Sequence, residues 1–85
     1  MFVHNPDVIA TELEGELVLL NPRTQAMFSL NETGKLIWEY LGDSSAEQQA
    51  ARLAERFEVD LETAQRDVDA LTARLETAGL ILARV

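Results

Sequence analysis

The segment QAMFSLNETG (residues 25–34) contains the point at which the hydrophobic period of this chain changes. Up to Leu30 the side chains alternate between two faces, which is the pattern of a β-strand. Asn31 then offers a side-chain oxygen that accepts a hydrogen bond from an amide in the first turn of a helix. The segment therefore predicts a strand over residues 25–30 that leads directly into a capped helix.

Two further strands are expected before this segment. Over residues 7–13 the strand period of two places Ile9, Thr11 and Leu13 on one face. Residues 16–20 are rich in Leu and Val, a composition that predicts a central strand covered on both sides. Residues 14–15 and 21–24 have the composition of tight turns. The three strands are therefore expected to form an antiparallel meander.

Three helices are expected after the segment, because apolar residues recur there at helical spacing. Ser44 and Glu47 fit the capping box that begins a second helix. A third and longest helix is expected between Asp60 and Gly79, followed by an apolar tail over residues 80–82 that packs on the core. The predicted fold class is α+β: a three-stranded antiparallel sheet followed by three helices, similar to a winged helix-turn-helix with the sheet at the front.

Composition limits what this fold can do. Eighty-five residues suffice for one domain, so residues 1–85 are expected to form a single unit with a core over about residues 7–82. The absence of Cys excludes disulfides and zinc–thiolate sites. No apolar run approaches the ~20 residues that cross a bilayer, so we expect a cytoplasmic protein without a membrane partner. The net charge of −8, with Lys and Arg scattered along the chain, disfavours nucleic acid.

No residues in the sequence have the pattern of a catalytic or cofactor site. His4 is the only histidine, and we expect it to be solvated in a mobile N-terminal segment. Asp67 and Asp69 are two residues apart on a helix and point in different directions, which disfavours chelation. The common phosphate-loop, dinucleotide and zinc-protease motifs are absent. We therefore expect a protein that is not an enzyme and uses neither a metal nor an organic cofactor.

Two binding functions remain. In a helix-turn-helix the third helix would enter the major groove of DNA, but here residues 61–77 carry more acidic than basic side chains. In the other function, the strand over residues 25–30 binds a peptide. This strand lacks the charges and Pro residues that protect exposed sheet edges. If no helix covers it, an extended peptide can pair with its backbone.

A resemblance to a known family rests on three stretches: ELVLLNPRT (residues 16–24), FSLNETG (residues 28–34) and Ile37-Trp38. Together they resemble the PqqD-like family, and the likeness extends over about residues 7–82. Such domains recognise ribosomally synthesised, post-translationally modified peptides. Within the family, this free-standing chain is similar to the leader-binding proteins of lasso-peptide biosynthesis, and less similar to the branch that serves pyrroloquinoline quinone synthesis.

The resemblance implies a non-catalytic adaptor for the leader of a precursor peptide. The leader adds a strand beside the third strand and lies in the groove against the third helix. The implied partners are the leader, a leader peptidase and an ATP-dependent cyclase. A winged-helix DNA-binding regulator and a chaperone of pyrroloquinoline quinone biosynthesis are the alternatives. Because its edge is open, the chain is expected to be a monomer or a weak homodimer.

The residues expected to bind the peptide, by position in the family, lie on the third strand and the third helix. They are Gln25, Ala26, Met27, Phe28, Ser29, Leu30, Asp67, Ala70, Leu71 and Arg74. Phe28 and Leu30 are expected in the core with partial exposure to the groove, whereas Met27 and Ser29 point to the far face of the sheet. Trp38 is expected in the core.

Overall fold

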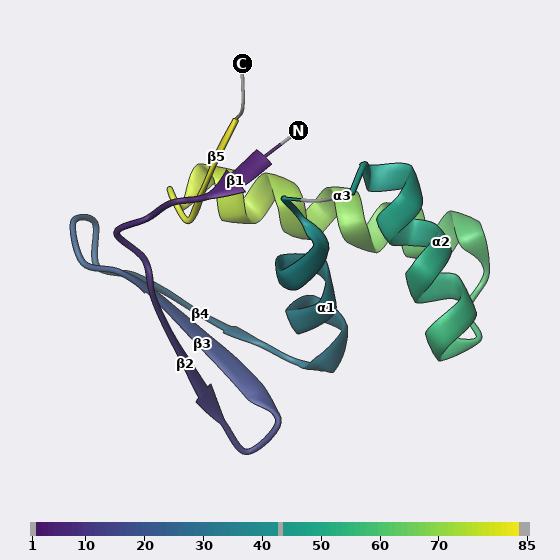
Figure 1. The fold of residues 1–85 in the computed structure, drawn as a ribbon, viewed down its shortest axis with the longest axis horizontal. Coiled ribbons are helices and arrows are strands. Elements are labelled where there is room, and N and C mark those ends of the chain that lie inside the picture. Colours follow the sequence, from purple (N-terminus) through teal and green to yellow (C-terminus); the bar gives the residue numbers. More distant parts are fainter. Residues whose placement is uncertain (1, 43, 84–85) are drawn as a thin grey trace.

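The structure is a computed structural model that describes residues 2–42 and 44–83. The described chain forms a three-stranded antiparallel sheet, three helices and a two-stranded sheet that joins its two ends (Figure 1). The elements are β1 (Phe2–His4), β2 (Ile9–Leu13), β3 (Glu16–Asn21), β4 (Ala26–Leu30), α1 (Glu32–Tyr40), α2 (Ala46–Phe57), α3 (Leu61–Thr77) and β5 (Ile81–Ala83). The α+β fold with a three-stranded sheet before three helices is confirmed.

The main sheet has the strand order β2–β3–β4, which is the expected meander with β4 at one edge. Glu14 and Gly15 connect β2 to β3 with φ angles of 41° and 86°, the positive values of a type I′ turn. Gln25, with φ of 62°, ends the turn before β4. β2 begins at Ile9 rather than at residue 7, because Asn5 accepts hydrogen bonds from the amides that follow it and holds them in a turn.

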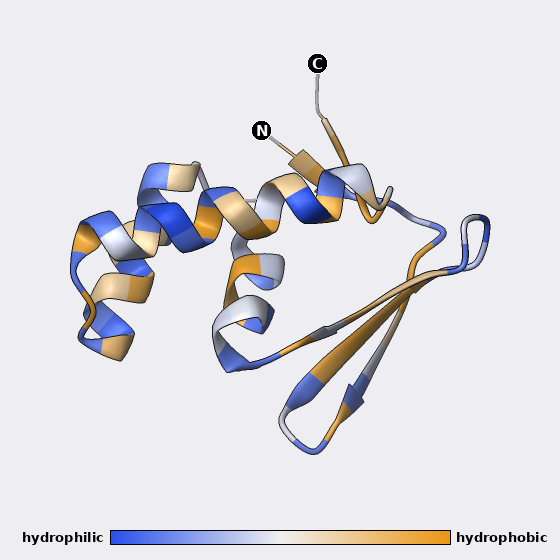
Figure 2. Cartoon of the chain, turned by 180° about the vertical axis from the view of Figure 1, so that it is seen from behind, coloured by the Kyte–Doolittle hydropathy of each residue, from blue (hydrophilic) through white to orange (hydrophobic). Residues whose placement is uncertain are grey.

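Helices cover only one face of the main sheet. Leu17 and Leu19 of β3 are buried in a cluster with side chains of α1 and α3. The other face carries Ile9, Leu13 and Met27, each of which is more than half exposed. The expectation that β3 is covered on both sides is therefore wrong, although β3 is hydrophobic along most of its length (Figure 2). The described helices that contact the sheet, α1 and α3, pack on the same side of it, and α2 packs on those two helices, so a hydrophobic strand has a solvent-facing side.

The first helix begins, and the third helix begins and ends, where the sequence predicted. The Asn31 side chain accepts a hydrogen bond from the Gly34 amide at 2.9 Å. The Asp60 side chain accepts from the Thr63 amide, and this bond lowers the pKa of Asp60 below its ordinary value of 3.8. Gly79 follows α3 with φ of 72°, a conformation that favours glycine.

The start of the second helix differs from the prediction by one residue. Ser45 and Gln48 form the capping box of α2, in place of the expected Ser44 and Glu47. Ser44 is buried, and its hydroxyl accepts a hydrogen bond from the side chain of Arg52, which lies within α2. The sequence offers two adjacent serines, and tertiary burial decides which of them caps the helix.

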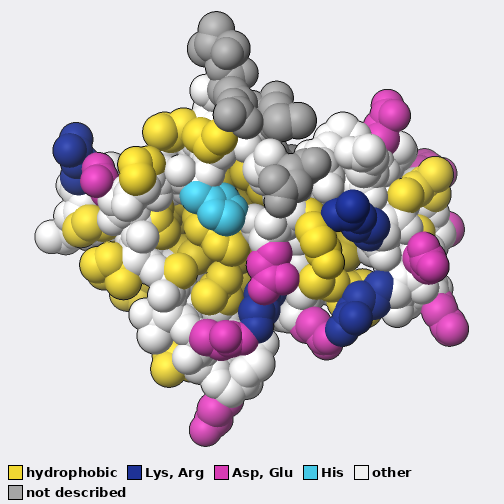
Figure 3. Space-filling view, in the orientation of Figure 1, with side chains coloured by type: hydrophobic (Ala, Val, Ile, Leu, Met, Phe, Trp, Pro, Cys, Tyr) yellow, Lys and Arg dark blue, Asp and Glu magenta, His cyan; other side chains and the backbone are white. Residues whose placement is uncertain are grey.

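The two chain ends meet in a small sheet that the sequence analysis missed. β1 pairs with β5, with His4 opposite Ile81. The His4 ring stacks on Trp38, with centroids 3.7 Å apart, and His4 Nε2 lies 2.6 Å from the Trp38 carbonyl oxygen. His4 is exposed, as expected, but the expectation of a mobile segment is wrong, because His4 belongs to a paired strand and stacks on Trp38. Figure 3 shows the histidine bordered by hydrophobic side chains. Strand pairing between distant ends of the chain produces this contact.

Two other expectations about the core are confirmed. Trp38 is 7% exposed and belongs to the buried cluster between the sheet, α1 and α3. The apolar tail also packs on this cluster, because Leu80 and Ile81 are buried within it. Ile81 continues into β5, so the tail both completes the core and pairs with the N-terminal strand.

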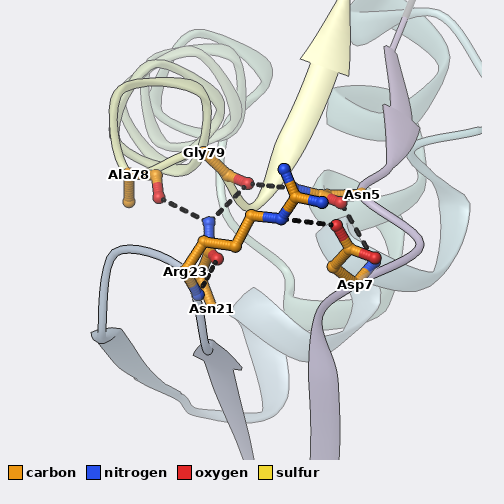
Figure 4. Close-up of polar contacts among 6 residues, drawn as sticks. All are labelled: Asn5, Asp7, Asn21, Arg23, Ala78 and Gly79. Atoms are coloured by element: carbon orange, nitrogen blue, oxygen red, sulfur yellow. Dashed lines mark hydrogen bonds and ion pairs between the residues drawn. The ribbon is translucent and has the colours of Figure 1, made fainter.

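A buried side chain connects the main sheet to the end of α3 (Figure 4). Asn21, which is 3% exposed, donates to the carbonyl oxygens of Gly79 at 3.1 Å and Ala78 at 3.5 Å. Its own side-chain oxygen accepts from the Arg23 amide at 3.0 Å. Asn5 donates to the same Gly79 carbonyl at 2.8 Å. These bonds attach the β3–β4 hairpin to the C-terminal end of α3.

Replacing Asn21 with Ala is expected to lower the free energy of unfolding by about 1–3 kcal/mol, because buried backbone groups lose their partner. Urea denaturation followed by circular dichroism measures this change. Gln65→Ala, at an exposed position of α3, serves as the control and should change stability by no more than about 0.5 kcal/mol. Equal stabilities of the two variants would contradict a structural role for Asn21.

Candidate functional site

A groove open to solvent lies between the edge strand β4 and the helix α3. Its volume is about 470 Å³. Seven of the residues expected to bind a peptide line it: Phe28, Ser29, Leu30, Asp67, Ala70, Leu71 and Arg74. The structure therefore brings together the two separate stretches, on β4 and on α3, that the sequence analysis selected.

The other three expected residues do not line the groove. Gln25 lies in the turn before β4. Ala26 is the first residue of β4 and pairs with Asn21 of β3. Met27 is 65% exposed, and alternation along the strand places its side chain on the uncovered face, as expected. For these residues, only contacts through the backbone are compatible with a peptide bound in the groove.

The floor of the groove is apolar. Leu30 is buried, and Phe28 is half-buried against the same core cluster, which confirms the expected mixture of core and groove exposure for Phe28. Leu71 is half-buried on the α3 side, between the two core clusters. Ala70 is exposed, and its short side chain leaves the α3 wall low at this point. Apolar side chains of a ligand can therefore be buried here.

Five residues that the sequence analysis did not select also line the groove. They are Glu16, Asn31, Thr33, Gly34 and Ile37. Most of them belong to the start of α1, which approaches β4 so closely that a Cβ on Gly34 would lie 3.2 Å from the Leu30 Cβ. The helix cap at Asn31 signalled where α1 begins, but not that this end would face α3. Ser29, expected on the far face only, lines the rim, where its hydroxyl donates to Glu16 at 3.0 Å.

The two charged side chains of the α3 wall, Asp67 and Arg74, lie toward its opposite ends. The Arg74 guanidinium carbon is 5.2 Å from the centre of the Phe28 ring, in cation–π geometry. Beyond this pair the groove continues into a second hollow lined by Ala73, Thr77 and Ala78. Asp67 lies two helical turns away from Arg74, toward α1.

The described residues contain neither a cluster of metal ligands nor a membrane-spanning helix. Across residues 2–42 and 44–83, no three His, Asp or Glu side chains are grouped so that they hold a metal ion. Over the same ranges, no helix has the length and hydrophobicity needed to span a membrane.

The geometry of the site agrees with sequence comparison. A family model described as coenzyme PQQ synthesis protein D (PqqD) matches residues 16–81. The chain belongs to the PqqD family. The matched range includes both walls of the groove, from β3 through α3, and ends at the first residue of β5. A comparison with curated protein sequences found no match.

Solved structures similar to this PqqD-family chain extend the comparison. A structure described as lasso peptide synthetase B1 complexed with the leader peptide is 30% identical, with a TM-score of 0.86 over 96% of this chain and 98% of the other. A structure described as TbiB1 in complex with the TbiA(beta) leader peptide is 24% identical, with a TM-score of 0.83 over 96% of both chains. At that identity the second likeness concerns the fold alone. Both cover nearly the whole length of this chain.

Proposed function

We propose that this chain binds the N-terminal leader of a ribosomally synthesised precursor peptide and is not itself an enzyme. In this proposal the leader pairs with β4 as an added strand and lies in the groove against α3. The adaptor then delivers the precursor to a leader peptidase and an ATP-dependent cyclase, as in lasso-peptide biosynthesis. The observation that carries the proposal is the open edge of β4 beside an apolar groove, in a fold similar to a lasso peptide synthetase B1 that was solved with its leader.

The two edges of the sheet differ in protection. β2 carries Glu12, which pairs with Lys35 of α1, and Asp7 precedes it and pairs with Arg23 at 3.2 Å. Charges of this kind discourage the pairing of further strands. β4 contains neither a charged residue nor Pro. An unprotected edge is unusual in a natural sheet, and binding an extended peptide is a function that requires one.

The strand register indicates which backbone groups of β4 face the open edge. A two-residue type I′ hairpin closes on a hydrogen-bonded pair, here Leu13 and Glu16. Hydrogen-bonded and non-bonded pairs alternate along the strands. The backbone N–H and C=O groups of the odd-numbered residues of β3 therefore point toward β4, where they pair with those of the even-numbered residues such as Phe28. The amides and carbonyls of Met27 and Ser29 consequently point to the open edge. These groups are available to a leader strand.

The side chains of the groove complement such a strand. Alternate side chains of a paired leader would point toward α3, where Leu30 and Leu71 offer apolar surface. The small Ala70 leaves room for a large side chain of the leader. Main-chain hydrogen bonds to β4 would thus give affinity for any extended peptide, and the side chains of α3 would determine which peptide sequences bind.

The family description favours a second candidate function, the binding of a peptide precursor of pyrroloquinoline quinone. The same β4–α3 groove would serve both functions, so the two differ in which peptide the chain binds. Fluorescence-anisotropy titrations with a labelled lasso leader, a labelled pyrroloquinoline quinone precursor and a DNA duplex compare the candidates directly. The net charge of −8 and the acidic composition of α3 disfavour the duplex.

Met27→Pro is expected to weaken binding of the leader encoded beside this chain by about tenfold or more, because Pro removes an edge amide and its ring obstructs pairing. Ala10→Pro is the matched control, because the same alternation directs the Ala10 amide to the opposite edge. Fluorescence anisotropy measures both affinities, and the control should stay within about twofold of the original chain. If a folded Met27→Pro variant bound the leader unchanged, strand addition at β4 would be wrong.

Ala70→Arg is expected to reduce leader binding by at least about tenfold, because a long charged side chain would occupy the apolar groove. Ala51→Arg introduces the same side chain at an exposed position of α2 and should leave the affinity nearly unchanged. Isothermal titration calorimetry compares the two. Full binding by Ala70→Arg would move the peptide site away from α3.

A further inference from the structure

Arg74 differs from the other cationic side chains that the structure describes. Arg23, Lys35, Arg56 and Arg66 each form an ion pair with a carboxylate, and Arg52 donates to a serine hydroxyl. Within residues 2–42 and 44–83, the Arg74 guanidinium has neither an ion pair nor a hydrogen bond, although acidic residues outnumber basic ones by about two to one in this chain. Instead, the guanidinium makes a cation–π contact, in which its carbon lies 5.2 Å from the centre of the Phe28 ring.

Arg74 lies where a peptide bound along β4 would contact its unpaired charge. Arg74 lines both the main groove and the hollow beyond it, so a peptide that extends along β4 through both has to pass the guanidinium. Contact with an aromatic face leaves the five N–H donors of the guanidinium available in its plane. A carboxylate accepts two such donors at once, which is the strongest neutralising contact that a peptide side chain can offer to Arg.

Resting on the proposed function, we propose that Arg74 is a specificity-determining residue that binds an Asp or Glu side chain of the leader. The carboxylate forms a charge-assisted pair with the guanidinium at the level of Phe28. In the free protein the Phe28 ring holds Arg74 over the groove, so the donor is already in place when the leader arrives. This recognition adds a charge requirement to the shape and backbone pairing already described.

The opposite charge at the other end of the groove makes the recognition directional. Asp67 lies on the same face of α3, and Glu16, which accepts a hydrogen bond from Ser29 near the end of β4, is a second carboxylate that lines the groove. Asp67 and Arg74 are seven residues apart, which corresponds to about 10 Å along the helix axis. An extended strand covers that distance in about three residues at ~3.3 Å each. Side chains on one face of a strand recur every second residue. A leader carboxylate and a leader cation that are two or four residues apart can therefore reach Arg74 and Asp67 at the same time.

The order of these two leader charges then sets the direction of the added strand. A leader in the correct orientation places its carboxylate at Arg74 and its cation at Asp67. In the reversed orientation each charge meets its like, which is unfavourable in a groove that the bound peptide shields from water. The backbone pairs of β4 accept either direction, so the charged side chains supply the discrimination.

A double-mutant cycle between the protein and the leader tests this proposal. The probe is the labelled leader of the precursor encoded beside this chain, together with versions in which each Asp or Glu is replaced singly by Asn or Gln. The protein variants are Arg74→Gln, Arg74→Glu and the control Arg66→Glu, which makes the same charge change on α3 outside the groove. Circular dichroism establishes that each variant is folded before anisotropy titrations at low and high salt.

The proposal expects one leader carboxylate whose replacement weakens binding by about tenfold in the original chain and by no more than about twofold in Arg74→Gln. Arg74→Glu should weaken binding further, and a Lys at that leader position should restore it. Arg66→Glu should stay within about twofold of the original chain. Salt should weaken binding less in Arg74→Gln than in the original chain.

Other outcomes separate this proposal from the proposed function. If the leader binds, Ala70→Arg blocks it and Arg74→Glu does not weaken it, the groove function stands and the role of Arg74 is wrong. The same conclusion follows if the leader binds tightly and none of its carboxylates couples to Arg74. If the folded original chain does not bind the leader at all, both proposals are wrong.

Discussion

Asn21 lies at the end of β3, beside the hairpin that begins β4, and its amide donates to the carbonyls of Ala78 and Gly79 that end α3. Both walls of the groove therefore depend on one buried side chain, because the strand wall starts next to Asn21 and the helix wall ends against it. A peptide that adds to β4 contacts α3 at a lower free-energy cost when the distance between the two is set before binding. The polar contacts of Asn21 supply that preorganisation, and Asn5 reinforces them through the same Gly79 carbonyl.

The rest of the fold leaves β4 open while stabilising everything around it. The β1–β5 sheet holds the two ends of the described chain together, and the His4–Trp38 stack adds a contact to α1. Among the described helices, α1 and α3 pack on one face of the main sheet, and β4 has a partner strand only on its β3 side. The cost of this arrangement is an exposed strand that other chains can pair with. A bound leader would remove that exposure, which joins the stability of the domain to its proposed function.

Acidic composition and groove chemistry have separate roles. A net charge of −8 disfavours contact with nucleic acid and anionic membranes and favours long-range attraction of basic segments. Inside the groove the local pattern is different, because Arg74 provides a single cation against Phe28 and Asp67 provides the opposite charge farther along α3. Net charge alone would suggest a uniformly basic ligand. The arrangement of side chains favours a leader that carries both charges in a defined order.

Local signals in the sequence determined most of the elements, including the strand and the helix that form the walls of the groove, whereas the resemblance to a family placed these two elements side by side. Period-two alternation, the caps at Asn31 and Asp60 and the glycine at position 79 each act over a few residues, so they can be recognised without the fold. The missed features all depend on residues far apart in the sequence. They include the β1–β5 sheet with its His4 stack, the burial of Ser44 that moves the α2 cap, and the uncovered face of a hydrophobic strand. The start of α1 entered the groove for the same reason: the packing of α1 between β4 and α3 is decided when the core closes, and no local pattern encodes it.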